Sequence, residues 1–390
     1  MIKGIFIHDL PVYKDVNGIY CSTTMTDDLF ARYLKHVDHL YVAARVYKIN
    51  KTYKDAHQEP ITVDNITFLE YPNMNTIKGL FTVIPKIKKD LTNVMRDMDL
   101  IFVRGGTLAR MGADIALKLK KPYLIEVAGC EWEAYWNHSV LGKIAAPFAE
   151  LTVRNYVKKA NYAIYVTEHI LQKRYPTKAI STYASNVILT DIDDDALDRR
   201  IKKIECNKDS EHIVIGTTAG IDNKAKGQQF VIEVMSQLSD KFDIIYELVG
   251  GGDQTFLRNM AKKYGIEDKV VFKGQLNHNE VLKWLDEIDI YVQPSMQEGL
   301  PRSVIEALSR ACPTIGSNSG GTPELLENKY VFKRGNIDSL RNALVNIIED
   351  DKKRIAERNF NKSKEYELSI LNERRDKIYN SYKEYVIGEK

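Results

Sequence analysis

The sequence has few cysteines and no long apolar run. Its four cysteines, Cys21, Cys130, Cys206 and Cys312, are scattered over 390 residues without the paired spacing of zinc sites or redox motifs. Buried thiols in a reducing cytosol fit this pattern. No segment approaches the roughly 20 uninterrupted apolar residues of a membrane span, and the first 14 residues resemble a buried strand more than a signal peptide. We therefore expect a cytoplasmic protein that is at most peripheral to a membrane.

Metal-binding patterns are also missing from the sequence. No carboxylate–histidine cluster has metal-ligand spacing, and no Asp-x-Asp pair lies in a plausible loop. We therefore expect no required metal and no bound cofactor. What is present is an ordinary globular composition, 44% hydrophobic and 28% charged, in a chain long enough for two or three domains.

The net charge of +3 is unevenly distributed. Residues 1–190 contain 25 Lys and Arg against 18 Asp and Glu, whereas the remainder contains 31 against 35, so the first part carries +7 and the second −4. A basic first half favours an anionic partner there, such as a phosphate-bearing lipid or a membrane surface. An uneven but solvated surface is the alternative.

Short β-rich runs alternate with amphipathic segments such as 26–37 and 107–120. This alternation predicts βαβ units and parallel sheets. It stops at the charged, apolar-poor segment 191–211 and then restarts, which predicts two Rossmann-like α/β domains facing each other across a cleft. We assign 1–190 to a first domain, 191–211 to a linker and hinge, 212–361 to a second domain and 362–390 to a final amphipathic helix that returns to the first domain. The strand-like runs are 3–9, 39–46, 100–106, 122–129, 162–167, 212–220, 242–252, 269–274, 288–295 and 312–318.

The stretch "DIDIYVQPSMQEGLPRSVIEAL" reads as a strand, a loop and a helix. Pro301 suits the first turn of that helix. The free N–H groups of Gly299 and Leu300 then lie at the helix N-terminus, where they attract an anion such as a diphosphate.

Two glutamates flank this anion site. Glu298 precedes the helix, and Glu306 lies roughly 7–8 Å along its axis, at 1.5 Å per residue. Carboxylates in these places suit vicinal hydroxyls, one pair on each sugar of a nucleotide-sugar. For either glutamate alone, a solvated charge is the alternative.

Residues 274–326 resemble the donor-binding half of the retaining family-4 glycosyltransferases, which have the GT-B fold. The stretch "GQLNHNEVLKWLDEIDIYVQPSMQEGLPRSVIEALSRACPTIGSNSGGTPELL" follows that family's order, from the preceding strand to the Gly-Gly-x-Pro-Glu loop. Glu298 and Glu306 fill its E-x(7)-E pattern. The resemblance implies that Glu298 contacts the donor sugar and Glu306 the ribose hydroxyls.

The same resemblance assigns further donor contacts. Lys226, in "KAKGQQF", matches the lysine that neutralises the donor diphosphate, which makes Lys226 and Glu298 the catalytic candidates. Leu276 stands where the family lays the nucleobase against the backbone. Gly18 occupies the place of its first Gly-rich loop, although an Asn-Gly turn is an equal alternative there.

Two positions depart from the family pattern. Gly220 stands where an arginine is usual, so that Lys224 is either a substitute cation or an exposed loop charge. Gly129 stands where a histidine is often found near the reacting sugar. The sequence does not indicate what replaces these two side chains.

Acceptor-side candidates follow two strands of the first half. Arg104 ends "LIFVR", and Glu131, Trp132 and His138 lie in "CEWEAYWNHS" after the next strand. Aromatic rings stack on pyranose faces and carboxylates accept from sugar hydroxyls, which favours acceptor binding. Core packing for the tryptophan, and surface positions for the arginine and histidine, are the alternatives.

Two segments mix apolar residues and lysines at helical spacing, 76–90 and 142–160. Such a face can rest on an anionic membrane, or it can pack on the domain's own sheet.

We therefore expect a metal-independent, retaining glycosyltransferase for cell-surface polysaccharide such as capsule or O-antigen. It would use a UDP-sugar rather than a GDP-sugar as co-substrate, a glycan or lipid-linked acceptor, and no nucleic acid. A nucleotide-sugar epimerase and a non-catalytic nucleotide-sugar-binding protein are the alternatives.

Overall fold

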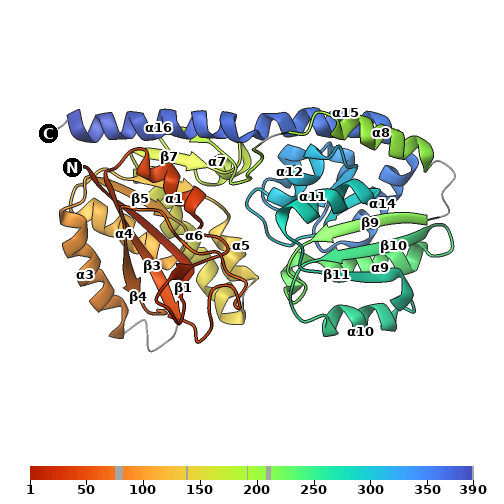
Figure 1. Cartoon of the computed structure of the whole chain (residues 1–390), viewed down its shortest axis with the longest axis horizontal. Helices are drawn as coiled ribbons and strands as arrows, with labels where there is room; N and C mark the ends of the chain where they lie inside the picture. Colours follow the sequence, from red (N-terminus) through yellow and green to blue (C-terminus); the bar gives the residue numbers. More distant parts are fainter. Residues whose placement is uncertain (75–81, 138, 191, 208–211, 389–390) are drawn as a thin grey trace.

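The computed structural model describes residues 1–74, 82–137, 139–190, 192–207 and 212–388. Two sheets form the centres of two halves that lie side by side, with helices around each sheet (Figure 1). The predicted architecture of two facing α/β halves is therefore confirmed. No helix within the described ranges combines the length and apolar character needed to cross a membrane.

The first sheet has the order β4-β3-β1-β5-β6-β7-β8, and all of these neighbours are parallel. A short strand, β2, adds antiparallel to β1. The central strands are buried on both faces, as parallel sheets covered by helices are. The strands are β1 (Lys3–Lys14), β2 (Tyr20–Cys21), β3 (His39–Lys48), β4 (Ile66–Tyr71), β5 (Leu100–Arg104), β6 (Leu124–Val127), β7 (Tyr162–Tyr165) and β8 (Ile180–Tyr183).

Strand β1 is longer than the sequence pattern indicated. We expected it to end at Asp9, but a bulge between Ile7 and Pro11 lets it continue along β3 to Lys14. The helices around this sheet are α1 (Asp27–Leu34), α3 (Ile84–Arg96), α4 (Gly106–Lys118), α5 (Glu131–Trp136), α6 (Val140–Lys159) and α7 (Ile170–Arg174).

The second sheet is also parallel, in the order β11-β10-β9-β12-β13-β14. Strand β9 lies between β10 and β12, so later strands are added to the sheet on both sides of it. Such a reversal of strand order leaves a crevice beyond the carboxyl end of β9. The strands are β9 (His212–Thr218), β10 (Asp243–Val249), β11 (Val270–Gly274), β12 (Ile290–Gln293), β13 (Thr314–Ser317) and β14 (Val331–Phe332). The helices are α9 (Gln228–Leu238), α10 (Thr255–Lys263), α11 (His278–Glu287), α12 (Arg302–Ser309), α13 (Thr322–Leu325) and α14 (Ile337–Glu349).

The segment that we assigned to the linker contains a helix, α8 (Ala196–Cys206). Its buried Arg200 donates to the carbonyl oxygens of Leu285 at 2.5 Å and Ile288 at 2.6 Å, which ties the helix to the second half. Residues 191 and 208–211 of the predicted linker lie outside the described residues.

The C-terminal chain returns to the first half, as predicted. Helix α15 (Lys352–Ser363) lies on the second half, and α16 (Leu368–Gly388) continues along the first (Figure 1). The single helix expected from residue 362 is thus divided by a short 3-10 turn at Lys364–Tyr366. The buried Tyr382 hydroxyl fixes α16, because it accepts from the Ile101 N–H at 3.0 Å and lies 3.0 Å from the Pro122 carbonyl oxygen.

We predict that Tyr382→Ala lowers the free energy of unfolding by about 3–5 kcal/mol, the usual cost of deleting a fully buried aromatic ring. The matched variant Tyr385→Ala changes a ring that is 39% exposed on the same helix and should cost less than about 1 kcal/mol. Urea denaturation followed by circular dichroism measures both. Equal losses would show that α16 is not anchored through Tyr382.

Candidate active site

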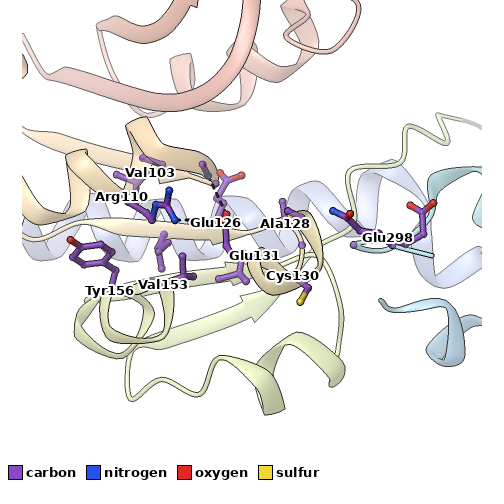
Figure 2. A pocket seen from close by; sticks show the side chains of 18 of the residues that line it. Val103, Arg110, Glu126, Ala128, Cys130, Glu131, Val153, Tyr156 and Glu298 are labelled. Carbon is purple, nitrogen blue, oxygen red and sulfur yellow. Dashed lines mark hydrogen bonds and ion pairs between the residues drawn. The ribbon is translucent and has the colours of Figure 1, made fainter. Parts of the chain in front are cut away.

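A cavity of about 370 Å³ lies between the two halves, and we call it the Lys226 cavity. Figure 2 shows Arg110, Glu126, Glu131 and Tyr156 on its first-half side and Glu298 on the other. It lies beyond the carboxyl ends of strands from both sheets, where α/β folds bind their ligands. The lining also includes Gly105, Gly106, Ala128, Gly129, Asn223, Lys226, Gln297 and Gly299.

Lys226 and Glu298 meet in this cavity although they follow different strands. Lys226 ends a 3-10 turn after β9, and the next residue, Gly227, has a φ of +78° and packs so closely on Pro294 that any Cβ would collide with its carbonyl oxygen. The Lys226 ammonium is 2.7 Å from the Glu298 carboxylate, which also accepts from Gln293 at 3.0 Å. The two catalytic candidates are therefore brought together as an ion pair.

Glu306 lines a second cavity of about 540 Å³, the Glu306 cavity. Burial raises the pKa of Glu306, and the neighbouring His278 and Arg302 offset part of that effect. The Nδ1 atom of His278 is 3.9 Å from the carboxylate. Leu276, two residues before His278, is half-buried against the core and is not among the residues that line either cavity.

The two cavities adjoin where the halves touch. Ala128 and Gly299 line both cavities. A Cβ at Gly299 would collide with the carbonyl oxygen of Ala128. The Gly299–Leu300 turn before α12 is thus held directly against the backbone of the first half.

Arg104 faces the Glu306 cavity rather than the Lys226 cavity. It lies 3.7 Å from Glu126, and its Nε is buried without a hydrogen bond among the described residues. On the adjacent strand, burial and then the charge of Arg104 lower the pKa of His8 to about 3, so this histidine is neutral and does not compete for an anion.

The other acceptor-side candidates separate. Glu131 lines the Lys226 cavity and accepts from the Gly106 N–H at 3.2 Å. Trp132 stacks on Trp136, with ring centroids 5.4 Å apart, and lines a different cavity together with Arg154, Arg174 and Arg334. His138 lies outside the described residues.

Gly18 is not brought to either cavity. Because β1 continues to Lys14, Gly18 falls in the turn to β2, where its φ is +81° and its N–H donates to Asp15. This placement corresponds to the Asn-Gly turn that was the alternative at this position.

Sequence reasoning missed Arg110. It lies one turn into α4, donates to Thr107 at 3.0 Å and is 3.9 Å from Glu131, inside the Lys226 cavity. Glu126, at the end of β6, was also missed. It accepts hydrogen bonds from the hydroxyls of Tyr33 at 2.6 Å and Tyr379 at 2.8 Å. The available signal was that Glu126 lies near the carboxyl end of a predicted strand, and Arg110 in the first turns of the helix that follows another.

Comparison with known proteins identifies the fold and the family. The family model described as "Glycosyl transferases group 1" matches residues 198–364. Protein CapJ of Staphylococcus aureus is 30% identical over 399 residues, covering 98% of this chain and 96% of its own. This chain belongs to the glycosyl transferases group 1 family. It is a glycosyltransferase, which rules against the epimerase alternative.

Two further relatives are informative for this glycosyltransferase. The UDP-Gal:alpha-D-GlcNAc-diphosphoundecaprenol alpha-1,3-galactosyltransferase of Escherichia coli is 28% identical over 151 residues, 37% of this chain and 38% of its own. The crystal structure of HepE from Anabaena in complex with UDP-glucose superposes with a TM-score of 0.66 at 16% identity, over 98% of this chain and all of that one. The latter likeness concerns the fold alone.

The structure also places the two positions at which this group 1 glycosyltransferase departs from the expected pattern. The Gly220 carbonyl accepts from Gln228 at 3.2 Å, and Gly129 lines the Lys226 cavity. Lys224 lies over the ring of Phe256, 4.3 Å from its centroid. Since Lys224 does not line the Lys226 cavity, its position corresponds to a loop charge.

We predict that Glu306→Gln stabilises the ligand-free protein at neutral pH. A carboxyl whose pKa is raised above its unfolded value of about 4.5 stabilises the fold most at or below that value, and its contribution falls as the pH rises through the raised pKa. The variant should therefore melt at the same temperature as the wild type near pH 4 and at a higher one by pH 8.

Glu327→Gln is the matched control for this pH series. A hydrogen bond from Arg354 lowers the pKa of Glu327, so this variant should lose stability at neutral pH instead. Thermal denaturation between pH 4 and pH 8 measures both differences. If Glu306→Gln melted lower than the wild type at pH 8, the carboxylate would not be the buried, poorly compensated charge described above.

Proposed function

We propose that this protein transfers a sugar, with retention of configuration and without a metal ion, from a UDP-sugar to a lipid-linked glycan in the synthesis of a cell-surface polysaccharide. The observation that carries the proposal is the Lys226–Glu298 pair, which faces Arg110 and Glu131 across one cavity. Two cations and two carboxylates around a cavity of about 370 Å³ suit a sugar next to a diphosphate.

Each donor-side residue has a proposed role. Lys226 and the amides of Gly299 and Leu300 bind the diphosphate, and Glu306 accepts from the ribose hydroxyls. In the absence of donor, Glu298 neutralises Lys226 at 2.7 Å. When a donor binds, the diphosphate takes over that charge, and Glu298 becomes available to accept from a hydroxyl of the donor sugar.

The proposed reaction is a front-face displacement. The bond from the anomeric carbon to the diphosphate oxygen breaks, and the acceptor oxygen bonds to the same face of that carbon. The acceptor proton passes to the departing phosphate, so no dedicated protein base is required. Negative charge grows on the diphosphate as the bond breaks, and Lys226 stabilises it most strongly at that point.

The acceptor belongs on the first-half side of the Lys226 cavity. Glu126 and Glu131 accept from sugar hydroxyls there, and Arg110 donates. Arg104, in the adjoining cavity, has a buried Nε–H without a hydrogen bond in the described part of the chain, and it suits a phosphate of the donor or of the acceptor. The names of two similar proteins, one acting on a diphosphoundecaprenol acceptor and one crystallised with UDP-glucose, support this choice of substrates.

We predict that Lys226→Ala lowers the turnover of a UDP-sugar by roughly 10²–10³, the scale seen when one preorganised oxyanion donor is removed. Lys224→Ala is the matched control, two residues away, and should cost little because this lysine lies over Phe256. Donor hydrolysis at saturating nucleotide-sugar measures turnover, and circular dichroism checks folding. Near-normal turnover of Lys226→Ala, with loss in Lys224→Ala, would falsify the role of Lys226.

We further propose that helix α6 rests on an anionic membrane surface. Its large side chains Val140, Leu141, Ile144, Phe148 and Leu151 are 63–76% exposed, whereas its opposite side lines the Lys226 cavity through Val153 and Tyr156. A helix whose outer face is apolar and whose inner face borders the cavity would bring a lipid-linked acceptor to the site.

The second segment considered for membrane contact differs. Helix α3 buries its apolar residues Ile87, Leu91 and Met95 against its own half, and Lys88 is held by Asp114 at 2.7 Å. This arrangement fits packing on the domain's own sheet for residues 84–90. Residues 75–81 lie outside the described part of the chain.

We predict that the double variant Phe148→Glu and Leu151→Glu no longer sediments with phosphatidylglycerol vesicles. Each apolar side chain that the membrane buries contributes about 1.5–3 kcal/mol, and each new charge is repelled. Val271→Glu, an equally drastic change at an exposed residue of the second half, should still sediment. The α6 proposal fails if wild type and double variant sediment alike, whatever the outcome for donor hydrolysis.

A further inference from the structure

Glu324 of the second half binds three backbone amides of the first. Its carboxylate accepts from the N–H groups of Glu168 at 2.7 Å, His169 at 3.0 Å and Ile170 at 2.6 Å. These amides lie at the start of α7, where helical N–H groups have no partner within the helix. A charged acceptor makes stronger hydrogen bonds than a neutral one, so this is a firm contact between the halves.

The contact lies where the chain crosses between the halves. The returning chain pairs with the outgoing chain there, because the Leu368 N–H donates to the Leu189 carbonyl oxygen at 2.9 Å. Tyr366 is buried at the same junction, and the charges of Glu324 and Glu168 contribute, after burial, to the rise of its pKa. Glu324 therefore lies close to the place where the chain crosses between the halves.

A short turn joins Glu324 to the donor-binding loop. The Gly321 N–H donates to the Gly299 carbonyl oxygen at 2.6 Å, and a Cβ at Gly320 would collide with the carbonyl oxygens of Glu298 and Gly299. On its other side, a Cβ at Gly321 would lie only 2.7 Å from Thr167 of the first half. The turn is thus held between the donor loop and the first half, and the next helix, α13, presents Glu324.

We propose that Glu324 is a positioning residue that sets how the donor loop meets the first half. Its hydrogen bonds to the amides of residues 168–170 hold the Gly320–Gly321 turn in place. That turn in turn holds the Glu298–Gly299 loop against Ala128. The effect expected on turnover rests on the proposed function, whereas the effect on the contact does not. The ion pair between Arg334 and Glu133, at 2.5 Å, is a second contact between the halves, but it involves neither the Gly320–Gly321 turn nor the chain crossing at Leu189 and Leu368.

Three variants test this role. Glu324→Ala removes all three hydrogen bonds. Glu324→Gln retains one carbonyl oxygen, which suffices for His169 and Ile170 because both donate to the same carboxylate oxygen. Glu327→Gln is the matched control, since that carboxylate pairs with Arg354 at 2.7 Å within the second half.

Hydrogen–deuterium exchange followed by mass spectrometry is the first measurement. In Glu324→Ala, we expect faster exchange at 168–174 and also at the two loops that meet at Gly299, 128–131 and 297–300. Glu324→Gln should give a smaller change, and Glu327→Gln should leave all three segments as in the wild type. This measurement needs no substrate, so it stands even if the protein hydrolyses no UDP-sugar.

Calorimetric binding of UDP and turnover of a UDP-sugar are the second measurement. Because the residues assigned to the nucleotide, Lys226, Gly299, Leu300 and Glu306, belong to the second half, the Kd for UDP should stay within about threefold in all variants. The kcat should fall about tenfold or more in Glu324→Ala and less in Glu324→Gln. Faster exchange confined to 168–174 with normal kcat, or unchanged exchange throughout, would overturn the proposal.

Discussion

The direct backbone contact between the two halves is the constraint around which the site is built. Gly299 lies so close to the Ala128 carbonyl oxygen that any side chain at that position would separate the halves. This contact lets the Lys226 cavity and the Glu306 cavity adjoin, so that one extended ligand can reach both. Two parallel sheets make the arrangement possible, because the carboxyl ends of their strands point into one crevice.

The charges around that crevice are balanced before any ligand binds. Glu298 neutralises Lys226, Glu131 lies near Arg110, and Glu126 near Arg104. Glu306 is less well compensated, since burial raises its pKa and its histidine neighbour is 3.9 Å away. A ligand that carries both negative phosphates and hydroxyl donors can replace these internal pairs with partners of its own, which a purely anionic or purely neutral ligand cannot.

Local sequence signals predicted the parts of this structure that local physics determines. The buried strands, the helix start after Gly299–Leu300 and the lysine turn at Lys226 depend on residues near one another in the chain. The edge strands β4 and β8 lack a continuous apolar run, so they were missed. Gly18 and Trp132 were assigned to the site because each follows a predicted strand. The bulge that lengthens β1 leaves Gly18 in a turn, and Trp132 stacks on Trp136 and lines a different cavity. Both the bulge and the stack are tertiary features. Arg110 was overlooked because Glu131, the charged partner beside it in the cavity, comes from a different helix.

The distribution of contacts along the interface indicates how the halves can move. Chain crossings, the Glu324 hydrogen bonds and the Leu368–Leu189 pair are concentrated on one side, where α15 and α16 span both halves. The contacts nearer the cavities are a glycine packed on a carbonyl group and an ion pair between Arg334 and Glu133. An ion pair with one exposed partner contributes little free energy to holding the halves together. The van der Waals contact between Gly299 and the Ala128 carbonyl group contributes only slightly more. We therefore propose that the halves open on the cavity side while the side with the chain crossings stays fixed, an asymmetry that would suit donor entry and product release.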